Sequence, residues 1–112
     1  MNELIVNLHL HTVYSDGSAT HAAIARAALK SGIDVVIVTD HNVLVHGLEG
    51  YHQDGNRRLL MLVGEEVHDQ ARKPQKNHLL VLGADRELAG YADSPQAVID
   101  QARLDGGLTF LA

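Results

Sequence analysis

The sequence predicts an α/β fold in which buried strands alternate with helices around one sheet. Four short apolar runs lack polar alternation, which is typical of strands covered on both faces. Two further segments have the periodicity and capping residues of helices. Each of the four apolar runs also has a histidine or an acidic residue at one end. With 112 residues, the chain is expected to form one domain at most.

The first apolar run ends in His9-Leu10-His11, and Asp16 follows shortly after. In a strand, this spacing turns both imidazoles to the same face. Imidazole is the commonest metal-binding side chain, and a carboxylate is a natural co-ligand. The segment therefore indicates the beginning of a metal site, although by itself it fits a pair of surface histidines beside a turn equally well.

Two helices are predicted. The first runs from Thr20, which can cap its amino end, to Ser31, and Gly32 suits a left-handed stop. The second opens with Ser94-Pro95, a capping serine followed by a proline in the first turn, and continues to Gly106-Gly107. The first helix is expected to cover the sheet.

The next three apolar runs strengthen the metal interpretation. The second strand ends in Asp40-His41, the third ends in Glu65-Glu66, and the fourth is entered through His78. These strands are predicted at 34–39, 59–64 and 79–83. Parallel strands bring their carboxyl ends together at the face where sites are built, so these groups are expected to meet. For His78, either its strand runs the other way or the preceding loop carries it to the site.

Residues 40–58 and 67–77 are predicted as long loops, the first with one short helix near Leu48 to His52. Loops this long inside a compact domain are usually functional. A last apolar run predicts a fifth strand at 108–112. A domain does not normally end on such an uncovered strand. A closed barrel needs about 200 residues or more. We therefore expect a truncated half of a larger barrel, or a half completed by a partner, and self-association through the uncovered strand.

Composition excludes several classes of function. A formal net charge of -5 without a basic run argues against binding duplex nucleic acid through its phosphates. The chain has no cysteine, so any metal must be held by nitrogen and oxygen ligands. No segment has the length needed to span a bilayer and no targeting signal opens the chain, so no membrane association and a cytoplasmic location are expected.

Four segments together resemble the first three motifs of the PHP domain, named for polymerase and histidinol phosphatase. They are His9-Leu10-His11-Thr12, Tyr14-Ser15-Asp16-Gly17, Thr39-Asp40-His41-Asn42 and Gly64-Glu65-Glu66. The resemblance covers essentially all of residues 1–112, and the middle section is most similar to the branch of carbaryl-hydrolase-like metallohydrolases. It implies the N-terminal half of a distorted (β/α)7 barrel.

The resemblance also implies a multinuclear site for two or three divalent ions, Zn, Mn or Fe. The residues that it places around the metals are His9, His11, Asp16, His41, Glu66 and His78. Glu66 is implied as the carboxylate that bridges two metals, and Asp16 as either a ligand or a close partner of one. In the family, further ligands come from a His-Pro motif and a later Asp-x-His pair. The chain ends at Ala112, before that motif, so the third metal is expected to be absent and the first weakly held.

PHP domains usually hydrolyse phosphoesters with a metal-activated water, so the implied partner is a small ester, most often phosphorylated. The implied catalytic residues are Asp40, His41 and Glu66, with Asp40 orienting an imidazole or a water. Hydrolysis of a carbamate or carboxylic ester and a non-catalytic metal-binding module both remain open. The missing ligands leave the activity of this chain by itself open as well.

The other histidines are expected outside the ligand set. His21 lies in the first turn of a helix without another ligand type nearby in the pattern, which predicts a solvated side chain. His46, His52 and His68 are expected in loops that can overhang the site, where surface positions are favoured over contact with a substrate. Glu65 is expected to point away from Glu66, because successive residues of a strand face opposite sides.

Overall fold

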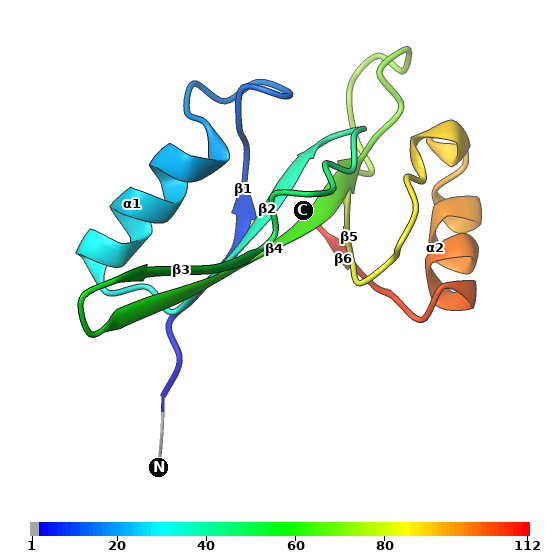
Figure 1. The fold of residues 1–112 in the computed structure, drawn as a ribbon. Helices are drawn as coiled ribbons and strands as arrows, with labels where there is room; N and C mark the ends of the chain where they lie inside the picture. Colours follow the sequence, from blue (N-terminus) through cyan, green and yellow to red (C-terminus); the bar gives the residue numbers. More distant parts are fainter. Residues whose placement is uncertain (1–2) are drawn as a thin grey trace.

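The computed structural model describes residues 3–112, which form one curled sheet of six strands and two α-helices (Figure 1). The strands are β1 (Val6–Leu10), β2 (Val35–His41), β3 (Gly50–Asp54), β4 (Arg57–Val67), β5 (Leu79–Leu82) and β6 (Leu108–Leu111). The helices are α1 (His21–Ser31) and α2 (Pro95–Leu104), with a 3-10 turn η1 (Ala89–Tyr91). The mixed α/β class is confirmed, and the curled sheet is compatible with part of a barrel.

Strand direction explains which ends of the strands meet. The spatial order is β1-β2-β4-β5-β6, with β3 paired to β4 outside this path. β1, β2 and β4 are parallel, whereas β5 runs antiparallel to β4 and to β6. The carboxyl ends of the three parallel strands therefore lie beside the start of β5. His78 reaches this edge because β5, the strand that follows it, runs antiparallel to β4. Of the two arrangements expected for His78, the reversed strand is therefore confirmed.

Both helices form where the sequence predicts them. Thr20 Oγ accepts a hydrogen bond from the Ala23 N–H at 3.1 Å, and Gly32 takes the left-handed conformation with φ 77°. Ser94 caps α2 in the same way. Such caps stabilise a helix by about 1 kcal/mol each. No helix in residues 3–112 combines the length and the apolar character that a membrane crossing requires.

The predicted loop at 40–58 is wrong in its second half. In place of a short helix near Leu48 to His52, β3 forms a hairpin with β4, in which Asp54 pairs with Arg57. Gly55 adopts φ 61°, as the first central position of a tight hairpin turn allows. The strand is polar and largely exposed, so it lacks the hydrophobic alternation from which strands are usually recognised.

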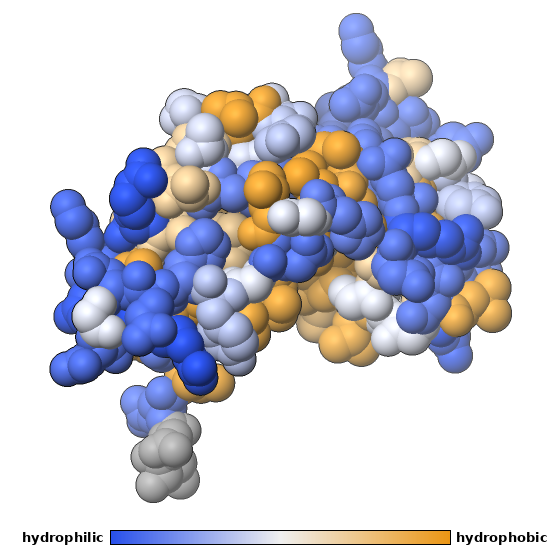
Figure 2. Space-filling view, in the orientation of Figure 1, coloured by the Kyte–Doolittle hydropathy of each residue, from blue (hydrophilic) through white to orange (hydrophobic). Residues whose placement is uncertain are grey.

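The apolar core lies on one face of the sheet, in two clusters. Under α1, the largest buried side chains come from β2 and β4: Val36, Val38, Leu59 and Met61. Under α2, the buried side chains include Val67, Leu79, Val81 and Leu88. Residues 59, 61 and 67 are separated by even numbers of positions along β4, so their side chains point to the same face of the sheet. Both helices therefore cover that face. Figure 2 shows apolar side chains gathered across the middle of the molecule, between more polar ends.

Glu65 is buried on this helix-covered face, with 1% of the residue exposed. One carboxyl oxygen accepts a hydrogen bond from the Leu88 N–H at 2.8 Å. The other, Oε2, is buried without a hydrogen-bond partner in the described part of the chain. Burial raises the pKa of Glu65 to about 7, because the ionised form loses its hydration and the hydrogen bonds offset only part of that loss.

This raised pKa predicts how stability depends on pH. Between pH 4.5 and about 7 the unfolded chain releases the Glu65 proton while the folded chain keeps it, so the free energy of unfolding falls as pH rises. The full loss is on the order of 3 kcal/mol. Glu65→Gln cannot ionise, so its stability relative to the wild type should increase across this range in urea unfolding with a chelator present. The prediction would be contradicted if the free energy of unfolding changed with pH in the same way in both proteins.

β6 forms an edge of the sheet and pairs only with β5 within residues 3–112. Leu108 and Leu111 are 63% and 81% exposed there. Because such an edge can pair with another chain, we expect a mass above that of a monomer in light scattering. Leu111→Lys should reduce the mass, whereas Leu104→Lys, on an equally exposed leucine of α2, should not. A uniform wild-type monomer would refute self-association.

Candidate metal centre

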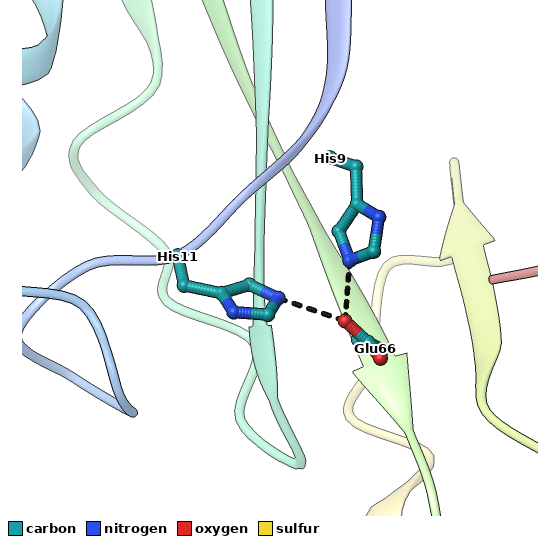
Figure 3. Close-up of side chains that lie close together, drawn as sticks. All are labelled: His9, His11 and Glu66. Atoms are coloured by element: carbon teal, nitrogen blue, oxygen red, sulfur yellow. Dashed lines mark hydrogen bonds and ion pairs between the residues drawn. The ribbon is translucent and has the colours of Figure 1, made fainter. Parts of the chain in front are cut away.

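A carboxylate and two imidazoles meet at the edge where β1 and β4 end. Glu66 Oε1 lies 2.5 Å from His9 Nε2 and 2.7 Å from His11 Nε2 (Figure 3). The register between β1 and β2 shifts between Asn7 and Leu10, so the strand is irregular around His9. The Glu66 side chain is only 4% exposed. Two residues far away in the sequence thus converge on one buried oxygen.

The second oxygen of Glu66 faces a different pair of histidines. Oε2 lies 2.9 Å from His78 Nδ1 and 3.9 Å from His41 Nδ1. His41 ends β2 and pairs in register with Glu66 on β4, whereas His78 precedes β5. Glu66 therefore offers one oxygen to each of two neighbouring histidine pairs, which is the geometry of a carboxylate that can bridge two cations.

Asp16 links the two histidine pairs from the loop after β1. Its Oδ1 lies 2.7 Å from His11 Nδ1, and its Oδ2 lies 3.1 Å from His41 Nε2. The side chain is 63% exposed. Desolvation would raise its pKa, but the nearby His41 and His11 rings lower it below the usual value. This position fits both expectations for Asp16, as a ligand or as the partner that orients two ligands.

These side chains form three overlapping groups that can each hold a metal ion, since the ligand atoms within a group lie within 4.8 Å of one another. The groups are His9, His11 and Glu66; His11, Asp16 and His41; and His41, Glu66 and His78. Together they contain all six predicted ligands. An independent observation supports the fit: His41 Nδ1 is buried, has no hydrogen-bond partner in residues 3–112, and faces Glu66.

The electrostatics favour an ionised carboxylate at the centre. Burial alone would raise the pKa of Glu66, but hydrogen bonds with the rings of His9, His78 and His11 outweigh it and lower the pKa to about 2. Burial lowers the pKa of His41, although the Glu66 carboxylate works against this. An ionised acid beside a neutral imidazole is the protonation pattern that metal binding requires.

Asp40 precedes His41 in β2, so its side chain points to the opposite face of the sheet. It pairs in register with Glu65 on β4. The residue is 1% exposed, and its carboxylate accepts hydrogen bonds from the Thr12 N–H, the Thr12 hydroxyl and the Ser15 hydroxyl at 2.6 to 2.7 Å. These bonds anchor the loop that carries Asp16. Asp40 thus acts on the site through this loop, and its expected contact with an imidazole or a water stays a prediction.

His21 differs from expectation, and His68 takes the less favoured of its two expected positions. His21 is not solvated: the residue is 4% exposed, its ring packs edge-on against Tyr14, and burial lowers its pKa. His68 lies beside the candidate ligands, stacked on His78 with ring centroids 4.3 Å apart. Neither position carries a local sequence signal, because both depend on how a loop folds back. His46 is exposed, as expected, and contacts Glu49.

A sequence model of the PHP domain family matches residues 7–94. No curated protein matches the chain closely enough to count as a relative. The match spans well over half of the chain and contains all six residues of the three candidate groups. The chain therefore belongs to the PHP domain family.

Proposed function

We propose that this domain is a metal-dependent phosphoesterase that hydrolyses a small phosphate ester. The PHP family is generally hydrolytic and metal-dependent, which gives the class of activity. The observation that carries the proposal is the position of Glu66, whose two oxygens each face a different group of histidines. The preference for phosphate rests on the charge of the site.

The six candidate ligands comprise two carboxylates and four imidazoles. Imidazoles bind metals in their neutral form, so the donor set carries two negative charges. Two divalent cations would leave the site with two positive charges, and a third would add two more. A phosphate monoester, which carries about two negative charges near neutral pH, complements this excess better than an uncharged ester does.

The donor set of imidazole nitrogens and carboxylate oxygens suits Zn, Mn or Fe. Bound there, such ions would polarise an ester oxygen and would lower the pKa of a water molecule, so that it could act as a nucleophile at neutral pH. The residues of the chain hold and orient this centre. Glu66 joins the histidine groups, Asp16 fixes the rings of His11 and His41, and Asp40 anchors the loop of Asp16.

A second candidate function is hydrolysis of an uncharged carbamate or carboxylic ester. The cavity beside the cluster, of about 540 Å³, favours it in one respect, because none of the described residues that line it is a lysine or an arginine. The lining residues are Tyr14, Ser15, Asp16, His41, His68, Gln70, Gln75 and His78. The same centre would serve both reactions, so only the choice of substrate separates them.

The metal proposal predicts a sharp difference between two neighbouring glutamates. Glu66→Gln should weaken Zn or Mn binding by about 100-fold or more in isothermal titration calorimetry, because an amide cannot provide two anionic oxygens. Glu65→Gln changes the adjacent residue on the opposite face and should bind metal as the wild type does. Equal affinities of all three proteins would rule out Glu66 as the centre.

The reaction class is tested by a panel of p-nitrophenyl phosphate, bis-p-nitrophenyl phosphate and p-nitrophenyl acetate with added Zn or Mn. We expect metal-dependent release of p-nitrophenol from a phosphate ester, reduced about 100-fold or more by Glu66→Gln. Turnover of the acetate alone would favour the second candidate. Tight metal binding without any turnover would identify a non-catalytic metal-binding module.

A further inference from the structure

His68 lies next to the candidate ligands without belonging to any of the three groups. Its ring stacks on that of His78, with an interplanar angle of 26°, and meets the ring of His41 edge-on at 4.8 Å between centroids. All three rings line the cavity of about 540 Å³ beside the cluster. His68 is therefore placed where the part of a substrate next to the reacting ester would lie.

The backbone of His68 is held rigidly. Asn42, which follows β2, accepts a hydrogen bond from the His68 N–H at 3.0 Å and donates one to the His68 carbonyl at 2.9 Å. This pair of bonds ties the end of β4 to the end of β2. His68 is thus fixed by the same two strands that carry His41 and Glu66.

Gln75 determines which ring nitrogen of His68 carries the proton. The Gln75 amide nitrogen lies within hydrogen-bond distance of three backbone carbonyls, those of Asp69, Gln70 and Arg72. This contact fixes the orientation of the amide, so Oε1 is the atom that lies 2.8 Å from His68 Nδ1. Because a carbonyl oxygen only accepts, Nδ1 must donate, and in the neutral ring the lone pair is left on Nε2.

His68 Nε2 has no hydrogen-bond partner among residues 3–112. It is also not among the buried unpartnered atoms, which are both ring nitrogens of His21, His41 Nδ1 and Glu65 Oε2. Nε2 is therefore open to solvent in a ring that lines the cavity. The ring presents a single acceptor in a fixed direction.

The rest of the cavity determines the chemistry that fits this acceptor. Among the described residues that line it, Asp16 is the one acidic side chain and none is a lysine or an arginine, so the lining offers no side-chain cation to a second anionic group on the substrate. Gln75 is engaged with the loop backbone and His68. Gln70 and Tyr14, which carry an amide and a hydroxyl, are also lining residues. This combination suits an uncharged group that carries hydroxyls.

We propose that His68 is a specificity-determining residue whose Nε2 accepts a hydrogen bond from a hydroxyl on the leaving alcohol of the ester, with Gln75 as its positioning residue. The proposal rests on the proposed phosphoesterase function. It names the substrate class as a monoester of a small, uncharged polyol, and it excludes alcohols that carry a second phosphate or carboxylate.

The test compares two esters of equal carbon number, glycerol 1-phosphate and propyl phosphate, on the metal-loaded chain. One neutral hydrogen bond corresponds to a preference of about 2- to 10-fold in kcat/KM for the glycerol ester. His68→Phe keeps a flat ring against His78 and should lower kcat/KM for the glycerol ester more than for propyl phosphate, so that the preference is lost. His68→Gln, which restores an acceptor, should recover part of it. Two outcomes would contradict the proposal: His68→Phe lowers kcat/KM equally for both esters, or it weakens Zn binding about 10-fold or more. In either case His68 would only support the metal ligands.

A second measurement does not depend on turnover. In protein labelled with ¹⁵N-histidine, two-bond ¹⁵N–¹H correlation spectra should show His68 with its proton on Nδ1, and Gln75→Met should abolish this uniform tautomer. In Zn-loaded protein, Nε2 of His68 should shift on addition of glycerol 1-phosphate and not of propyl phosphate. A proton on Nε2 in the wild type, or no ester-selective shift, would overturn the proposal. Absence of hydrolysis together with the selective shift would refute the phosphoesterase function alone.

Discussion

The buried carboxylate of Glu66 is the interaction on which the rest of the site depends. A carboxylate with a 4% exposed side chain is expensive to ionise unless several groups compensate for its lost hydration. Here the imidazoles of His9 in β1, of His11 just after it and of His78 just before β5 contact its two oxygens. The strands must therefore meet in this arrangement for the charge to be tolerated. Positive charge brought by a cation would compensate it further.

The alternation of β4 gives two adjacent glutamates opposite properties. Glu66 points to the face that the helices leave uncovered, where hydrogen bonds with histidines lower its pKa to about 2. Glu65 points beneath α2 and η1, where burial raises its pKa to about 7. Identical side chains one residue apart thus differ by about five pKa units, because a period of two separates a polar site from an apolar core.

The loops around the site are ordered by side chains that bond to backbone. Asp40 binds Thr12 and Ser15 and so fixes the turn that carries Asp16. In a similar way, the Gln75 amide donates hydrogen bonds to backbone carbonyls of the loop between β4 and β5. Neither Asp40 nor Gln75 contacts Glu66 directly. Each instead fixes the direction of another side chain, Asp16 in the first case and His68 in the second. Such bonds reduce the flexibility that long surface loops otherwise have.

The amino-acid sequence by itself determined the α/β class and both helices, because these follow from apolar runs and from local capping residues, and it indicated the six candidate ligands through motifs such as His9-Leu10-His11 that resemble the PHP domain. Only the tertiary structure decided the β3–β4 hairpin, the antiparallel direction of β5, the burial of His21 and the place of His68 beside His78. Pairing of strands and packing of a loop depend on partners that are distant along the chain. A single sequence carries no local signal for such contacts, so its periodicity predicts elements better than it predicts which side chains meet.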